Sequence, residues 1–202
     1  MSEEKRMAGS YEITQAFCVG DKEIVFGVDA KNKDGKKYMV AFCEQNEIFA
    51  SYTDVLTSDD YAEIVNLYAE RISAQAEKLK TELEQLAVPV EVITAEQCYL
   101  NDYSESIDGK VIAISLSALR PEYQRADRQI YLVDGGFGAN AKARGSAVFC
   151  INVYSGERTR WERRDVEGVI KAVELPEWAK KRLKVLLKEE KSVKKTANKE
   201  AR

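Results

Sequence analysis

The sequence predicts an α+β fold, in which an N-terminal antiparallel meander covered by a long amphipathic helix precedes a smaller β-rich unit with a C-terminal helix. Short apolar runs separated by turn residues occupy residues 10–53. A long helical repeat of apolar residues follows them directly. We therefore expect one unit over residues 1–88, a second over 89–190, and a disordered basic tail over 191–202, where apolar residues are scarce.

The first four expected strands form the meander. They are rich in Val, Ile, Phe and Tyr, as strands usually are. Turn residues such as Gly20-Asp21 and Asp34-Gly35 separate them. The stretch 38–43 is apolar at every position, so its strand should be buried on both faces. The four strands are placed at 10–18, 23–30, 36–44 and 47–53.

The helix after the meander is predicted from capping residues and from its apolar repeat. Ser58 is the expected N-cap, and Asp59 and Asp60 in the first turn complement the helix dipole. Pro89 ends the helix. We favour packing against the sheet over a partner-binding coiled coil as the use of the apolar stripe. The stripe consists of Tyr61, Ile64, Val65, Tyr68, Ile72, Ala76, Leu79, Leu83 and Leu86.

In the second half of the chain, the sequence predicts shorter secondary-structure elements. Residues 88–93, 110–119 and 128–134 are candidate strands, with a polar loop over 95–109. Residues 145–154 and 158–163 form an expected hairpin across Ser155-Gly156. Pro176 opens the C-terminal helix.

The composition excludes several common chemistries. The chain has no histidine, which removes Ser-His and Cys-His nucleophiles and histidine-ligated metal sites. Its four cysteines contain no CxxC pair, and Cys18, Cys43 and Cys150 are expected to be small buried hydrophobes. Carboxylate chemistry at Asp134 or Asp165 ranks last, because no second carboxylate stands at a suitable spacing. We expect a protein that is not an enzyme and holds no cofactor or metal.

The length of the apolar runs and the composition of the N-terminus predict where the protein is located. No run approaches the roughly 18 to 20 residues that a membrane helix needs. The N-terminus has charged residues but no apolar stretch of the kind that secretory signals carry. We expect a cytoplasmic protein that does not contact the membrane.

Charge is divided unevenly along the chain. Residues 1–110 hold 22 acidic and 11 basic residues, a net charge of −11, and residues 111–202 hold 12 and 20, a net charge of +8. Of that excess, +7 belongs to residues 180–202. The tail lysines could attract phosphates or could keep a solvated helix end soluble. They are Lys180, Lys181, Lys184, Lys188, Lys191, Lys194, Lys195 and Lys199.

The most distinctive stretch is the glycine-rich segment 134–145. It matches neither the dinucleotide-binding fingerprint, since Ala141 stands where glycine is needed, nor the P-loop, since no GK[ST] follows. Its glycines are typical of tight turns between strands. The alternative is a contact loop in which Lys142 and Arg144 reach an anionic partner.

Two charged surfaces are candidate partner-binding sites. Arginine beside an aromatic residue suits single-stranded nucleic acid, although neighbouring acids could neutralise the arginines in a solvated hairpin. This basic set consists of Arg158, Arg160, Trp161, Arg163 and Arg164. The acidic first half offers a surface that could face a basic protein channel or could simply be exposed to solvent. Its candidate residues are Asp59, Asp60, Glu63 and Glu70.

A series of short motifs runs through residues 108–182. They are RPEY (120–123), YLVDGGFGA (131–139), RGSAVF (144–149), YSGE (154–157), RWER (160–163) and LPEW (175–178). In these motifs the second half resembles small accessory proteins of Firmicutes mobile elements, a family with no catalytic residues to carry over. Cargo proteins of such elements often inhibit CRISPR or restriction nucleases, so the resemblance implies an anti-defence role by association.

Two functions follow as expectations. The first is a non-catalytic anti-defence protein that blocks a host nuclease with its acidic half. The second is a single-stranded nucleic-acid-binding accessory factor that uses the Arg/Trp hairpin and the basic tail.

Overall fold

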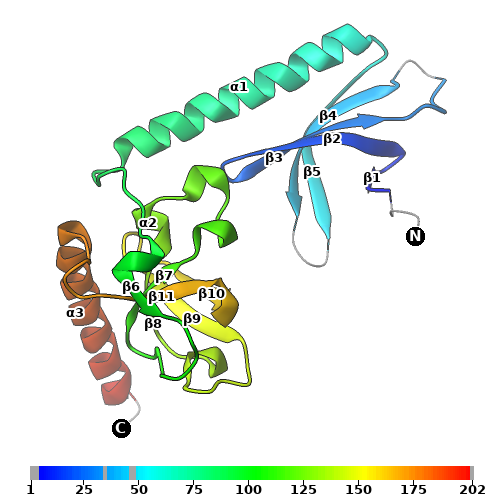
Figure 1. The fold of residues 1–202 in the computed structure, drawn as a ribbon. Helices are drawn as coiled ribbons and strands as arrows, with labels where there is room; N and C mark the ends of the chain where they lie inside the picture. The colour runs from blue at the N-terminus through cyan, green and yellow to red at the C-terminus, as the bar shows by residue number, and fades with distance from the viewer. Residues whose placement is uncertain (1–4, 34–35, 46–48, 201–202) are drawn as a thin grey trace. The chain divides into compact units, whose positions relative to one another are not determined.

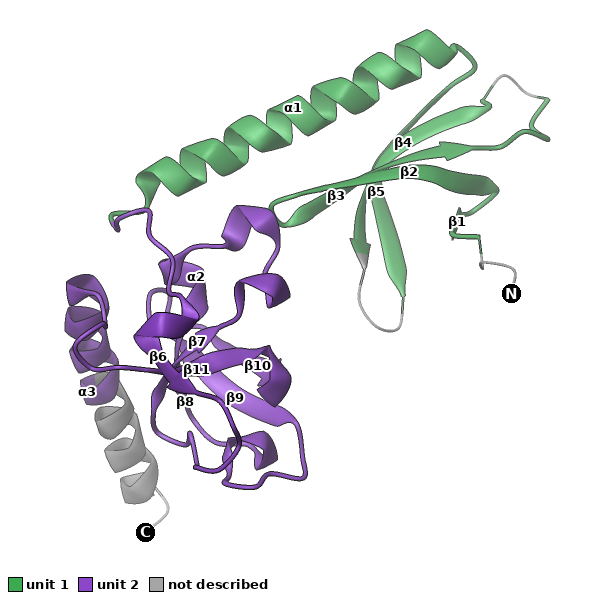
Figure 2. Ribbon diagram, in the orientation of Figure 1, with its two compact units in different colours: residues 1–87 green, residues 88–202 purple. Residues whose placement is uncertain are grey.

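The computed structural model has the α+β architecture that the sequence predicts (Figure 1). It describes residues 5–33, 36–45 and 49–200, with the side chains of Gln45 and of residues 189–200 left out of the description. The chain divides into two compact units, residues 1–87 and 88–202 (Figure 2). Among the described residues, no helix is both long and apolar enough to cross a membrane.

Unit 1 contains the expected meander and one short strand that the sequence did not reveal. Five antiparallel strands lie side by side in the order β1-β2-β3-β4-β5. The expected turn at Asp34-Gly35 lies outside the described residues. The strands are β1 (Met7–Ala8), β2 (Tyr11–Val19), β3 (Lys22–Val28), β4 (Tyr38–Gln45) and β5 (Ala50–Ser58).

The strand β4 is buried on both faces, as the apolar stretch 38–43 predicts, whereas β2 and β5 are largely exposed. Met39 and Ala41 of β4 pack on one face, while Val40 packs on the other, beneath the helix α1 (Tyr61–Gln85). Irregularities in the pairing of β2 with β3 and of β4 with β5 bend the sheet. The hydroxyl of Tyr52 on β5 donates to the Met7 carbonyl on β1 at 3.3 Å, so the two edge strands meet over the face opposite α1.

Arg6 lies on the face of the unit 1 sheet opposite α1. Arg6 donates to both carboxylate oxygens of Glu23, at 2.8 and 2.5 Å, and contacts the Cys43 sulfur at 2.9 Å. The hydrogen bond to Glu23 raises the pKa of Arg6. This pair fastens the segment before β1 to the central strand β3.

The helix α1 begins two residues later than the sequence indicates. Asp60, not Ser58, is the N-cap, because its carboxylate accepts from the backbone N–H groups of Ala62 and Glu63 at 2.8 and 3.1 Å. Ser58 instead donates to the Glu63 carboxylate at 2.5 Å and accepts from the Asp60 N–H. A carboxylate accepts these N–H bonds more strongly than a hydroxyl does, which favours Asp60.

The buried stripe of α1 is shorter than the apolar repeat. Of the repeat, Ile64, Tyr68, Ile72 and Leu79 pack on the sheet, whereas Val65 and Ala76 are exposed and Leu83 and Leu86 stand outside that cluster. Gln75 is buried and donates to Asp21, in the turn between β2 and β3, at 3.1 Å. The preference for sheet packing is confirmed for this part of the helix.

Unit 2 is a six-stranded antiparallel sheet in the order β10-β9-β8-β7-β11-β6. The helix α3 (Glu177–Glu200) covers one face, where Ala179 and Leu186 join the core. The other face buries Ile112, Tyr131 and Val148 under loops. The strands are β6 (Cys98–Leu100), β7 (Val111–Ile114), β8 (Ile130–Val133), β9 (Ala147–Asn152), β10 (Arg158–Glu162) and β11 (Val166–Ile170).

Three parts of unit 2 differ from the sequence interpretation. Residues 88–93 are not a strand: both the N–H and the carbonyl of Ile93 bond the side-chain amide of Gln129, at 2.8 and 3.0 Å. The expected polar loop contains β6, and β11 was not foreseen. Gly168 allows these two strands to pair closely, since a Cβ there would lie 2.2 Å from the Tyr99 carbonyl oxygen.

The C-terminal helix is longer than expected. Its backbone is helical from Glu177 to Glu200, just after Pro176. The disordered tail expected at 191–202 falls on residues whose side chains, or whose whole placement, lie outside the description.

The cysteines divide into buried and exposed. Cys43, Cys98 and Cys150 are buried, but Cys18 is exposed, so its expected burial is wrong. Burial raises the pKa of Cys98 to about 11 and that of Cys150 to about 12. These two thiols stay protonated at neutral pH and are poor nucleophiles.

The capping of α1 gives a matched pair of variants. Asp60→Ala should lower the free energy of unfolding by about 1 kcal/mol, because two helix N–H groups lose their acceptor. Asp59→Ala removes the same charge without a cap and should change it by less than about 0.5 kcal/mol. Urea denaturation followed by circular dichroism measures both, and equal effects would contradict the assignment of the cap.

Candidate functional site

The hairpin of β9 and β10 presents two arginines and an aromatic ring on one face. Its register places Arg160 opposite Phe149 and Arg158 opposite Ile151. Phe149 is 50% exposed, and the arginine side chains are 63% and 55% exposed. We call Phe149, Arg158 and Arg160 the arginine ridge. It borders a hollow of about 520 Å³ and lies at an edge of the sheet, because among the described strands β10 pairs with β9 alone.

Each ridge arginine has a carboxylate partner. Arg158 pairs with Asp134, and Arg160 donates to Glu162 at 2.5 Å. Exposed ion pairs of this kind contribute little stability, about 0 to 1 kcal/mol. A phosphate can therefore take a guanidinium from its carboxylate at low cost.

A second basic group lies beside the ridge. Glu162, the partner of Arg160, also lines a recess of about 390 Å³. We call this hollow the basic recess. It joins the glycine-rich loop to the end of the hairpin and is lined by Tyr103, Ala143, Arg144, Gly145, Ser146, Glu162, Arg163 and Arg164.

The basic recess carries guanidinium groups with little compensation. Within the described residues Arg144 has no ion-pair partner, and the nearest carboxylate to Arg164 is that of Asp165, at 3.8 Å. Glu162 is held by a hydrogen bond to Ser146, and this bond together with Arg160 and Arg164 lowers the pKa of the carboxyl. Arg144 and Arg164 thus remain available to an anion.

Arg163 is a structural residue, and its expected place in a contact surface is wrong. Its side chain is buried and donates to the Asn101 side-chain oxygen at 2.8 Å and to the carbonyls of Gly138 and Glu105 at 3.1 and 3.4 Å. It also stacks over the Tyr103 ring at 5.0 Å. Burial lowers its pKa, but an arginine stays charged at neutral pH. Arg163 forms the floor of the recess and joins the loops around it.

Trp161 does not point with the ridge. It pairs with Val148 on the opposite face, where it packs edge-on against Tyr131 with ring centres 5.8 Å apart. Phe149 supplies the exposed ring that the sequence analysis assigned to Trp161. The alternation of side chains along a paired strand could have revealed this, because Phe149 shares its face with Arg160.

The glycine-rich loop is packed closely for structural reasons. A Cβ at Gly136 would lie 2.4 Å from the Ala147 carbonyl oxygen, and Gly136 has a φ of 103°. A Cβ at Gly138 would lie 2.4 Å from the Ser146 carbonyl oxygen. These glycines thus have a structural role in the close packing of the loop, which also exposes Lys142 and Arg144.

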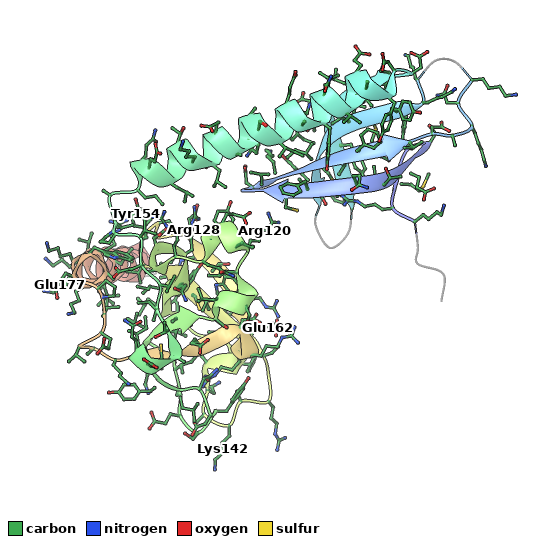
Figure 3. All side chains as sticks on the ribbon, turned by 45° about the horizontal axis from the view of Figure 1, so that its top comes forward. Arg120, Arg128, Lys142, Tyr154, Glu162 and Glu177 are labelled. Atoms are coloured by element: carbon green, nitrogen blue, oxygen red, sulfur yellow. The ribbon has the colours of Figure 1, made fainter. Side chains whose placement is uncertain are left out.

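Backbone strain is concentrated at the loops around the recess. Tyr103 and Lys142 have positive φ values of 63° and 51°, and the Lys142 N–H donates to the Tyr103 carbonyl at 2.8 Å. Such conformations are costly for residues other than glycine and are frequent at functional sites. Figure 3 shows Lys142 on the outside of its loop. Beside Gly145, a further aromatic residue, Phe137, is 80% exposed.

The acidic candidates lie in unit 1 and have mixed roles. Asp60 caps α1 and Glu63 bonds Ser58, so both are engaged locally. Asp59 and Glu70 are exposed. The structure does not gather the four into one site.

The two carboxylates considered for catalysis, Asp134 and Asp165, are engaged by neighbouring residues. The described residues contain no group of three His, Cys, Asp or Glu side chains placed to hold a metal ion. Asp134 is engaged by Arg158, and Asp165 accepts from the Glu162 N–H at 3.2 Å. No protein-family model, curated protein or solved structure matches the chain.

Replacing Arg163 should destabilise unit 2. Arg163→Lys should lower the free energy of unfolding by about 2 to 4 kcal/mol, because an ammonium cannot reach three acceptors in the planar fork geometry. Arg164→Lys, one residue away and exposed, should change it by less than about 0.5 kcal/mol. Chemical denaturation followed by the fluorescence of Trp161 and Trp178 measures both variants. Similar values for the two would show that Arg163 does not hold the loops.

Proposed function

We propose that this chain is a non-catalytic binding protein whose second unit binds single-stranded nucleic acid. The observation that carries the proposal is the arginine ridge, in which an exposed phenylalanine stands directly opposite one arginine and beside another. Aromatic rings stack on bases of any sequence, and guanidinium forks bond phosphates through two N–H groups. The basic recess adjoins this surface at Glu162.

The form of the surface favours an unpaired strand. A ring lying on a sheet face can stack only on a base that is not already stacked in a duplex. The strand β10 spans about 17 Å at the usual rise per residue. The ridge therefore fits a short extended stretch of nucleic acid, with bases on Phe149 and phosphates along Arg158 and Arg160.

The basic end of the chain supports the same proposal. Residues 88–202 hold 21 basic and 17 acidic residues, a net charge of +4. Lys180 is engaged by Glu177 at 2.8 Å and Arg182 by the Tyr154 carbonyl at 3.2 Å. The remaining lysines of α3 would add attraction that does not depend on sequence and that weakens with salt.

Variants of the ridge test this function. Phe149→Ala should weaken binding of a single-stranded oligonucleotide by about 1 to 3 kcal/mol, about 5- to 150-fold in Kd. Arg158→Gln with Arg160→Gln should also reduce the dependence of log K on log salt by about 1.4, for two lost phosphate contacts. Fluorescence anisotropy at several salt concentrations measures both.

Two control variants match these changes. Lys78→Gln with Lys80→Gln removes the same charge from the exposed face of α1, and Val173→Ala removes an exposed apolar side chain of unit 2. Both should bind as the parent protein does. Unchanged binding by the ridge variants, or absence of binding to any single strand, would refute the proposal.

A second candidate function is inhibition of a host nuclease by the acidic half of the chain. It is supported by the net charge of −7 over residues 1–87, with 17 acidic and 10 basic residues, and by the exposure of Asp59 and Glu70. The resemblance of the second half to accessory proteins of mobile elements fits this role by association. It ranks second because Asp60 and Glu63 are engaged within α1 and the segment before it.

A cell-based panel of CRISPR and restriction nucleases tests the second candidate. Asp59→Lys with Glu70→Lys should relieve inhibition, because reversed charges repel a basic channel. The ridge variant Phe149→Ala should inhibit as well as the parent chain does. Failure to inhibit any nuclease, or inhibition that follows the ridge instead, would count against it.

A further inference from the structure

The arginine ridge and the basic recess differ in local charge. In the ridge each guanidinium has a carboxylate partner, Asp134 for Arg158 and Glu162 for Arg160. In the recess Arg144 has no ion-pair partner among the described residues, and Asp165 lies 3.8 Å from Arg164. With Glu162 balanced by Arg160, the exposed guanidinium groups of Arg144 and Arg164 remain at the recess, and the buried guanidinium of Arg163 lines it as well.

We infer that the basic recess is a subsite for a terminal phosphomonoester of the bound strand. This inference rests on the proposed function, which it extends to recognition of a strand end. A phosphate inside a strand carries one negative charge, whereas a terminal phosphate carries about −1.5 to −2 at neutral pH. The charge of the terminal group matches two arginines, while the ridge, with its partnered arginines, matches the single charges of internal phosphates.

The geometry of the donors supports the same ligand. Arginine bonds phosphate oxygens in pairs, and a terminal phosphate offers three such oxygens. Arg144 comes from the glycine-rich loop and Arg164 from the end of the hairpin, so the two forks reach the recess from separate segments. The recess is a hollow of about 390 Å³, large enough for a phosphate group, and Arg163 fixes its floor.

The position of the recess links the end to the rest of the strand. Glu162 contributes to both surfaces, as the partner of Arg160 and as a lining residue of the recess. The exposed ring of Phe137 lies beside Gly145, another lining residue. A strand whose terminal phosphate enters the recess can place its first base near Phe137 and its following phosphates along β10.

The experiment compares one oligonucleotide sequence in three forms, with a 5′-phosphate, with a 3′-phosphate, and with hydroxyl groups at both ends. The parent chain should bind one phosphorylated form at least about tenfold more tightly than the hydroxyl form, because of the added charge-assisted hydrogen bonds. Which form it prefers identifies the end that enters the recess. Anisotropy of an internally labelled strand gives the three Kd values.

Two variants separate the recess from the ridge. Arg144→Gln with Arg164→Gln should abolish the preference for the phosphorylated end and leave the affinity for the hydroxyl form within about threefold, since both residues are exposed and outside the ridge. Phe149→Ala, in the ridge and outside the recess, should weaken all three forms equally and keep the preference. Thermal denaturation of both variants shows that the fold is retained.

The outcomes distinguish the inference from the proposed function. Equal binding of the three forms by the parent chain overturns the subsite and leaves the ridge function standing. If no oligonucleotide binds, the ridge function fails, and a titration with inorganic phosphate followed by NMR decides on the recess alone. Shifts at Gly145 and Ser146 that are lost in the Arg144/Arg164 variant support a phosphate subsite, and tight binding of a phosphoserine peptide but of no strand would overturn the assignment to nucleic acid.

Discussion

The buried guanidinium of Arg163 is the interaction on which the candidate site depends. It bonds the Asn101 side chain and the carbonyls of Glu105 and Gly138, and it stacks on Tyr103. Asn101 in turn donates to the carbonyls of Arg163 and Val166 at 3.1 and 2.8 Å. Loops distant in sequence are therefore joined by a single side chain. Without Arg163, the Asn101 side-chain oxygen and the carbonyls of Gly138 and Glu105 would each lose a hydrogen-bond donor. The loops that form the walls of the recess would then no longer be joined through one residue.

The burial of both faces of the unit 2 sheet explains why the candidate surface lies at an edge. The helix α3 covers one face, and loops cover the other, so neither face is open to a partner along its centre. The edge strand β10 carries Arg158, Arg160 and Glu162 on one face, which suits it to polar contacts and also discourages pairing with other chains. The glycine-rich loop then brings further arginine to this edge, because Gly136 and Gly138 let its backbone approach β9 closely.

The sequence predicted elements whose signals are local and repeated. The meander, the long helix and the hairpin all follow from alternation, from a helical period or from turn residues, and all three are present. The sequence missed β6 and β11, since β6 has three residues and Gly168 breaks the apolar pattern of β11. The site was predicted in part, since Arg144, Arg158, Arg160 and Arg164 do lie along one edge. Arg163 is not part of the exposed surface because it is buried, and Trp161 is not part of it because its side chain lies on the opposite face of the strand. The burial of Arg163 depends on tertiary packing, which residue type does not reveal, whereas the face of Trp161 follows from the alternation of side chains along the strand.

Local pairing, more than net charge, decides where this chain can attract an anion. Several acidic residues of unit 1 already have local partners: Glu23 binds Arg6, Glu44 binds Lys22 and Asp60 caps α1. Unit 2 is only mildly basic by count, yet it leaves Arg144 and Arg164 together with little compensation. Two exposed guanidinium groups at one recess, only one of them with a carboxylate within 4 Å among the described residues, create a stronger local field than a larger number of closely paired charges spread over a surface. The division between an acidic half and a basic end therefore describes the composition of the chain, whereas the position of Arg144 and Arg164 at one recess indicates where an anion can bind.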